Sequence, residues 1–216
     1  MEEVMSAELV ENLVDFCENR ARVYALLSRC YEKELDTAFA AELAEAARVE
    51  SDDPACLADL DEAALEQLAV VFNRVFFGMG PRSAQKAFPY ESVYTSEGGL
   101  MMQDAYSEVL RLYRAAGFAK DPGFTEPEDH LAVELAFMVR LCERAVEALR
   151  AGDEAAAEAA LAEQRAFVRA HLLNWVPAFA RDMKASAESG FYAHLATFTE
   201  AYLAADAEAL AEVVGD

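Results

Sequence analysis

The sequence predicts an all-α protein built as a single compact multi-helix domain. Apolar residues recur at the three- and four-residue spacing of a helix almost from end to end, whereas alternating runs of β-branched residues are missing. At 216 residues the chain lies near the upper range for one domain, and no long Pro/Gly/Ser stretch or block of charge divides it. We therefore expect one helical domain spanning residues 1–216.

The N-terminal part is predicted to form three helices. The first covers residues 6–31, and its broad apolar stripe drifts slowly round the axis, as is typical of a central core helix. Shorter helices are expected over residues 37–47 and, after a break at Pro54, over residues 61–77. Gly78 ends this pattern, because glycine readily adopts the left-handed conformation that closes a helix.

Helical periodicity fails between Gly78 and Gly99, where Gly, Pro and Ser dominate. A loop of this length inside a compact helical domain tends to be either functional or disordered. Its aromatic residues argue against disorder. The next helix is expected over residues 100–116, closing at Gly117.

A second loop, residues 118–125, leads into a long helix that we expect to begin at Pro127 and to reach Arg150. Proline suits a first helical position, because the amide proton that it lacks would be unpaired there, and neighbouring acids complement the helix dipole. A further helix is expected to about Leu173, and shorter helical segments over residues 174–214.

Two aspartates are predicted to cap helices. Asp61 precedes the helix over residues 61–77, and Asp153 precedes the alanine- and glutamate-rich helix. A carboxylate at this position accepts hydrogen bonds from the free amides of the first turn.

The chain is strongly acidic. Eighteen Lys and Arg stand against 40 Asp and Glu, which gives a formal net charge of −22. Phosphate backbones and anionic membrane surfaces are repelled by such a charge, so nucleic-acid binding is excluded and a cationic partner is favoured. Acidity is also a common route to solubility, and that alternative stays open at this point.

The chain is expected to stay in the cytoplasm. No apolar run approaches the roughly 20 residues needed to cross a bilayer. The N-terminus is acidic where a secretory signal is basic, and no small-residue cleavage site follows an apolar stretch.

Cysteine usage agrees with that compartment. Cys17, Cys30, Cys56 and Cys142 are scattered, without a C-x-x-C pair or a histidine at ligand spacing. We expect buried free thiols.

The sequence offers no positive case for catalysis, a cofactor or a metal. His130 and Glu134 share one helical face, but the helical di-iron class needs Glu-x-x-His on two helices, and no histidine here has that partner. There is no G-x-S-x-G, and the lone G-x-G at residues 78–80 has no following Gly-Lys-Ser/Thr.

Three stretches resemble motifs of a known family. They are residues 72–78 (Phe-Asn-Arg-Val-Phe-Phe-Gly), residues 89–94 (Pro-Tyr-Glu-Ser-Val-Tyr) and residues 126–131 (Glu-Pro-Glu-Asp-His-Leu), and a weaker fourth is residues 171–177 (His-Leu-Leu-Asn-Trp-Val-Pro). In this order and spacing they resemble the TorD-like redox-enzyme maturation chaperones, which include the DmsD type.

The resemblance implies a helical fold of the TorD-like type and a function in protein maturation. It implies a cytoplasmic chaperone that binds the twin-arginine signal peptide, and the apo-form, of an exported molybdoenzyme of the dimethyl-sulfoxide-reductase class. Export is thereby delayed until the molybdenum cofactor is inserted. Such a chaperone acts by binding, catalyses no reaction, and is expected to be a monomer or a weak dimer.

A twin-arginine signal presents two guanidinium groups followed by an apolar segment, so its receptor needs carboxylates beside an apolar groove. The candidate peptide-binding residues within the motifs are Phe76, Phe77, Tyr90, Glu91, Ser92, Tyr94, Glu126, Pro127, Glu128, Asp129 and His130.

Each candidate also has a purely structural interpretation. Glu126 and Pro127 could serve only to start a helix, His130 could pin a loop by bonding a backbone carbonyl, and Tyr90 and Tyr94 could fill the core. Three other functions stay open. They are a nitrate-reductase-type assembly chaperone acting on the enzyme body, a small helical metal- or nucleotide-dependent hydrolase, and a scaffold without a peptide groove.

Overall fold

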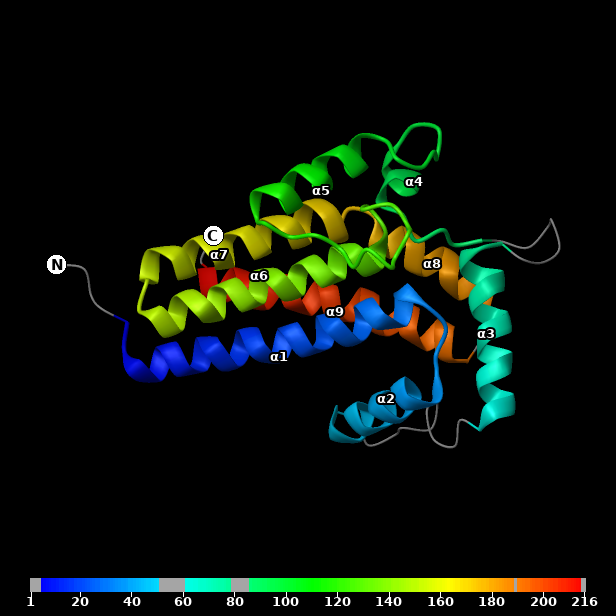
Figure 1. The fold of residues 1–216 in the computed structure, drawn as a ribbon, viewed down its shortest axis with the longest axis horizontal. Helices are drawn as coiled ribbons and strands as arrows, with labels where there is room; N and C mark the ends of the chain where they lie inside the picture. Colours follow the sequence, from blue (N-terminus) through cyan, green and yellow to red (C-terminus); the bar gives the residue numbers. More distant parts are fainter. Residues whose placement is uncertain (1–4, 51–60, 79–85, 189, 215–216) are drawn as a thin grey trace.

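The computed structural model describes residues 5–50, 61–78, 86–188 and 190–214 (Figure 1). In these ranges the regular structure is helical, which confirms the predicted all-α class, and the one β-bridge joins Tyr90 and His130. The helices are α1 (Ala7–Glu32), α2 (Thr37–Glu50), α3 (Glu62–Phe76), α4 (Glu91–Thr95), α5 (Asp104–Ala115), α6 (Leu131–Ala151), α7 (Glu154–Phe167), the π-helix η1 (Val168–Leu172), α8 (Val176–Ala187) and α9 (Phe191–Val214). The organisation as one domain stays a prediction.

The centre of the fold is an antiparallel pair of long helices, α1 and α6, against which α7 and α9 pack (Figure 1). α6 buries most of its surface, and Leu135, Phe137, Met138 and Leu141 have no exposed area. Each such side chain contributes roughly 1.5–3 kcal/mol by leaving water. α1 is therefore part of the core, as its apolar stripe predicts.

Both predicted aspartate caps are present. Asp61 Oδ1 accepts from the amide of Ala64 at 2.8 Å, and Asp153 Oδ1 from the amide of Ala156 at 3.0 Å. Gly117, with φ of 65°, follows the end of α5 as predicted.

The first predicted loop contains a helix, α4, which the sequence did not reveal because five residues are too few for a periodic pattern. The helix predicted from Leu100 begins instead at Asp104. Residues before it form a turn, in which Ser96 Oγ accepts from the amide of Leu100 at 3.0 Å. The predicted break at Pro54, Cys56 and residues 79–85 of the loop lie outside the described residues.

The predicted start of the long helix at Pro127 is wrong. α6 begins at Leu131, and His130 is its N-cap. The carbonyl of Pro127 accepts from the amide of His130 at 3.1 Å, while the amide of Leu131 donates to the carbonyl of Pro89 at 2.9 Å. Residues 126–130 therefore pair with the first loop instead of extending the helix.

The C-terminal third also departs from expectation. The helix predicted to reach Leu173 ends at Phe167 and continues as the π-helix η1, closed by a bond from the amide of Leu173 to the carbonyl of Val168 at 2.8 Å. Beyond Gly190 the chain forms α9, a single helix of 24 residues rather than short segments. α9 contains no Gly or Pro, so no residue that disfavours a helix breaks it into shorter segments.

The thiols of Cys17, Cys30 and Cys142 are buried and free, as predicted. Burial raises the pKa of Cys30 and of Cys142 to about 12, which keeps both as unreactive thiols at neutral pH. Across the described residues, no helix has the length and apolar character required to cross a membrane.

A buried ion pair ties α1 to α9. Arg20 Nε lies 2.5 Å from Asp206 Oδ1, and Nη2 lies 3.0 Å from Oδ2, with the two side chains 5% and 2% exposed. Tyr24 donates to Asp206 at 2.6 Å, and Gln164 of α7 accepts from Arg20. Every charged group is thus paired, which offsets the cost of taking both charges out of water.

We predict that Asp206→Asn lowers the free energy of unfolding by about 3–5 kcal/mol, because Arg20 then stays buried without its counter-charge. Glu18→Gln is the matched control, since Glu18 pairs with Arg150 at 2.6 Å on the surface, and should cost under about 1 kcal/mol. Urea denaturation measures both values. Equal losses for the two variants would contradict the role given to the buried pair.

Candidate functional site

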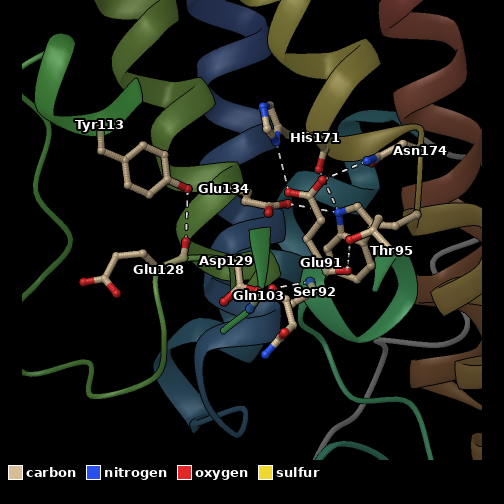
Figure 2. A network of polar contacts seen from close by, with 11 residues as sticks. Glu91, Ser92, Thr95, Gln103, Tyr113, Glu128, Asp129, Glu134, His171 and Asn174 are labelled. Atoms are coloured by element: carbon tan, nitrogen blue, oxygen red, sulfur yellow. Dashed lines mark hydrogen bonds and ion pairs between the residues drawn. The ribbon is translucent and has the colours of Figure 1, made fainter. Parts of the chain in front are cut away.

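Three of the four sequence motifs, residues 89–94, 126–131 and 171–177, meet around α4. Figure 2 shows the carboxylate of Glu91, the first residue of α4, between two residues that follow the end of α7. Glu91 Oε2 lies 3.0 Å from Nδ1 of His171, and Oε1 accepts from the amide nitrogen of Asn174 at 2.8 Å. Glu91 is 2% exposed, so these bonds are formed away from water and fix α4 against the bundle.

Asp129 holds the other side of α4. Its carbonyl accepts from the amide of Glu91 at 2.9 Å, and its Oδ2 accepts from the amide of Ser92 at 3.1 Å. Ser92 Oγ in turn accepts from the amide of Gln103 at 3.0 Å (Figure 2). Burial raises the pKa of Asp129 above its ordinary value, although the bonds from Ser92 oppose that shift. The hydrogen bonds that run from Gln103 through Ser92 to Asp129 therefore connect the two loops.

Glu134 lies beneath this arrangement with no exposed surface. Its Oε2 accepts from the indole nitrogen of Trp175 at 3.2 Å, while its Oε1 has no hydrogen-bond partner in the described part of the chain. Burial, and secondly the negative charge of Glu91, raises the pKa of Glu134 well above its ordinary value. The surroundings of Glu134 therefore favour its protonated form.

His130 links the network to a neighbouring pocket. Its Nδ1 accepts from the amide of Ala132 at 3.1 Å, which caps α6. The ring lies between Tyr90 and Phe124, edge to face with each, at centroid distances of 5.1 and 5.0 Å. Burial, and secondly the charge of Lys120, lowers the pKa of His130 to about 3. The imidazole is therefore neutral.

A small pocket of about 110 Å³ opens beside His130. Residues from the end of α1, the end of α3 and both loops line it, namely Tyr31, Glu32, Phe72, Phe76, Phe77, Pro89, Tyr90, Gly123, Phe124, Thr125, Glu126 and His130. Its walls are aromatic and its two carboxylates are Glu32 and Glu126. Glu126 accepts a hydrogen bond from the hydroxyl of Tyr90. Such a pocket suits a cation carried on an apolar stem.

The structure separates the eleven predicted residues into three groups. Phe76, Phe77, Tyr90, Glu126 and His130 line the pocket, whereas Glu91, Ser92 and Asp129 lie in the buried network. Tyr94, Pro127 and Glu128 belong to neither set. A direct contact between these residues and a peptide stays a prediction.

Two of these last three residues, Tyr94 and Glu128, have partners within the chain. Tyr94 stacks on Trp175 at a centroid distance of 5.6 Å and donates to Asp182 at 3.4 Å. Glu128 lies 3.6 Å from the ammonium group of Lys120, and its carbonyl accepts from the hydroxyl of Tyr113 at 3.2 Å.

Sequence reasoning missed several residues that shape the site. His171 and Trp175 were recognised as motif residues but received no role, because the contacts that they make to α4 and α6 cross long stretches of sequence. Tyr31, Glu32 and Phe124 line the pocket without any motif of their own. The one sequence feature that could have pointed to Tyr31 and Glu32 as pocket residues was their position at the end of α1.

In the ranges that the structure describes, no three His, Cys, Asp or Glu side chains converge to hold a metal ion. The Glu91–His171 pair is closed off from the solvent, with the two side chains 3% and 9% exposed.

We predict that His130→Asn reduces the acid sensitivity of the fold. The folded-state pKa of about 3 lies below the ordinary value of 6.5, so stability due to His130 is complete above pH 6.5 and is lost as the pH falls towards 3. Asparagine keeps an N-cap acceptor but does not titrate. Urea denaturation at pH 7 and pH 4.5 should show a stability loss smaller by about 2 kcal/mol in the variant than in the parent.

The exposed His194 provides the control, since His194→Asn should leave the pH dependence unchanged. Raised pKa values at Glu134 and Asp129 act with the opposite sign, but they are common to all three proteins. The same acid-induced loss in the parent and in His130→Asn would refute the role of His130.

Comparison with known proteins places the chain in a family. The model of the nitrate reductase delta subunit family matches residues 32–181. The chaperone protein TorD of Photobacterium profundum is 40% identical over 147 residues, which cover 68% of this chain and 65% of that protein. TorD of Vibrio parahaemolyticus is 33% identical over 209 residues, which cover 88% and 94%.

A solved structure shares the fold. A candidate redox enzyme maturation protein from Archaeoglobus fulgidus matches with a TM-score of 0.54 over 94% of this chain and 99% of that chain, at 19% identity. The family model covers more than half of the chain, and the Vibrio parahaemolyticus relative aligns over nearly its whole length. The chain therefore belongs to the nitrate reductase delta subunit family and, within it, to the TorD-like proteins.

Proposed function

We propose that this chain is a cytoplasmic chaperone that binds the twin-arginine signal peptide and the apo-form of an exported molybdoenzyme of the dimethyl-sulfoxide-reductase class. It delays export until the cofactor is inserted, and it acts by equilibrium binding without catalysing a reaction. The supporting relatives are those named as TorD chaperones. The single observation that carries the proposal is the aromatic pocket with its two carboxylates, Glu32 and Glu126.

The pocket matches the chemistry of an arginine side chain. Aromatic rings stack on the guanidinium plane and on the apolar stem, and carboxylates accept its N–H groups. Phe77, half exposed at the rim, extends the apolar surface towards the segment that follows the arginines. A volume of about 110 Å³ accommodates one side chain rather than two, so the second arginine is left to the remaining acids, of which Glu128 is partly exposed.

The buried candidates have a different role in this proposal. Glu91, Ser92 and Asp129 are positioning residues, because they hold the loop that carries Pro89 and Tyr90. They influence the peptide through the shape of the pocket wall.

A second candidate function is a nitrate-reductase-type assembly chaperone that acts mainly on the enzyme body. The observation that favours it is the match to the nitrate reductase delta subunit family over residues 32–181.

We predict that twin-arginine signal peptides of molybdoenzymes encoded in the same genome bind the chain with micromolar or tighter affinity, and that twin-lysine versions do not. Glu126→Gln and Glu32→Gln should each weaken binding about tenfold, equivalent to 1.4 kcal/mol, and raised salt should weaken it further. Calorimetric titration measures these affinities.

The matched control is Glu158→Gln, which removes the same charge from an exposed position on α7 and should leave the affinity unchanged. An equal effect of all three substitutions would assign the acids a long-range electrostatic role only. No binding of any peptide to the parent chain would favour the assembly chaperone, with the folded enzyme body as its ligand.

A further inference from the structure

Lys120 lies beside the acids to which the proposed function assigns the arginine pair. Its ammonium group donates a hydrogen bond to the backbone carbonyl of Glu126 and lies 3.6 Å from Oε1 of Glu128. Glu126 lines the pocket, where its carboxylate accepts from the hydroxyl of Tyr90. The ammonium group of Lys120 therefore contacts one residue of the pocket wall and the neighbouring acid.

The charge of Lys120 also acts on the pocket itself. Burial first, and then the positive charge of Lys120, lower the pKa of His130, which forms part of the pocket wall. Over residues 115–139 the sequence has no other Lys or Arg. Lys120 is therefore the one cation that this acidic segment supplies to its own carboxylates.

The contact between Lys120 and Glu128 is of a kind that an incoming guanidinium group can replace. The two side chains are 20% and 24% exposed, and 3.6 Å is longer than an ordinary hydrogen bond. Figure 2 shows the carboxylate of Glu128 directed away from the buried network around Glu91. An arginine presents five N–H donors in a planar fork, so it can bond the carboxylate of Glu128 and the carbonyl of Glu126 together.

Lys120 can leave its position without unpacking the second loop. On one side of Lys120 the ring of Phe118 packs against Tyr113, at a centroid distance of 5.0 Å. On the other side Phe124 packs against His130, also at 5.0 Å. The stem of a lysine is flexible, so rotation of this side chain alone carries the ammonium group away from the acids.

We propose that Lys120 is an intramolecular competitor of the signal peptide, whose ammonium group occupies the site of the second arginine at Glu128 and at the carbonyl of Glu126. This inference rests on the proposed function and adds a regulation of the same site. A twin-arginine peptide must displace Lys120, so its apparent affinity is reduced by the fraction of molecules in which Lys120 holds Glu128. When the peptide leaves, Lys120 pairs with Glu128 again.

A purely structural role of Lys120 predicts the opposite result. If its bonds to Glu126 and Glu128 served only to hold these acids in place for the peptide, their removal would loosen the site and weaken binding. If Lys120 competes with an arginine, its removal strengthens binding. The direction of the change in affinity therefore distinguishes the two roles.

The test is calorimetric titration of the full-length variant Lys120→Met with a twin-arginine signal peptide. Methionine keeps an apolar stem but carries no charge. We expect about fivefold tighter binding than in the parent, the size expected for one partly exposed ion pair that no longer has to be broken. A peptide in which one arginine is replaced by glutamine should bind Lys120→Met and the parent within twofold, because a single arginine fills the pocket without meeting Lys120.

Lys184→Met is the matched control. Lys184 forms a partly exposed ion pair with Glu200 at 2.9 Å and does not line the pocket, so its loss changes the net charge equally and should leave the affinity within twofold. Lys120→Arg keeps the charge and should bind the peptide no more tightly than the parent does. Circular dichroism melting verifies that every variant is folded, as expected for substitutions of partly exposed side chains.

A double-mutant cycle locates the competition at Glu128. Glu128→Gln should weaken binding of the twin-arginine peptide more in Lys120→Met than in the parent, because in the parent Lys120 already holds that carboxylate. Equal effects in the two backgrounds would contradict the assignment of Glu128 as the shared partner.

The outcomes separate this inference from the proposed function. Unchanged or weaker peptide binding by Lys120→Met would overturn the inference and leave the proposed function standing. An equal gain in Lys184→Met, or for the single-arginine peptide, would also overturn it, because net charge alone would then explain the effect. Binding by Lys120→Met but not by the parent would support both, and no binding by either protein would refute both.

Discussion

The carboxylate of Glu91 lies where segments distant in sequence meet, and the rest of the site depends on its hydrogen bonds to His171 and Asn174. α4 has only five residues and cannot be stable alone, because helix nucleation costs more than so few backbone bonds return. Its position is set by Glu91 on one side and Asp129 on the other. The pocket wall before α4 and the loop after it, residues 96–103, are therefore fixed by the same helix.

Three acids in one buried region present an electrostatic problem in a chain of net charge −22. The structure reduces it by raising the pKa of Glu134, which favours its uncharged form, and by supplying hydrogen-bond donors to Glu91 and Asp129. An apolar core of the same volume would avoid the desolvation cost altogether. A polar network instead specifies one orientation of α4, since the hydrogen bonds of Glu91 to His171 and Asn174 and of Asp129 to Ser92 form in only one register.

Sequence reasoning recovered the helical class and most long helices, because their stripes and the caps at Asp61 and Asp153 are local signals. It misplaced the start of α6 because Pro127 fits a first helical turn, and the competing pairing of residues 126–131 with Pro89 is not local. It named five residues of the pocket through motifs. The partners of Glu91 were not predicted, because a contact between residues 80 positions apart produces no periodic pattern in the sequence.

The π-helix η1 determines the direction in which the side chains of the following residues point. A residue inserted into an α-helical path turns later side chains by about 100° round the axis, and η1 absorbs one such residue. Removing a residue from the segment 168–172 would restore α-helical spacing while rotating Trp175 and Pro177 away from their present directions. One residue more or less in this segment would turn the side chains of α8 away from α4. Insertions and deletions among relatives should therefore be found in the loops and be absent from residues 168–172.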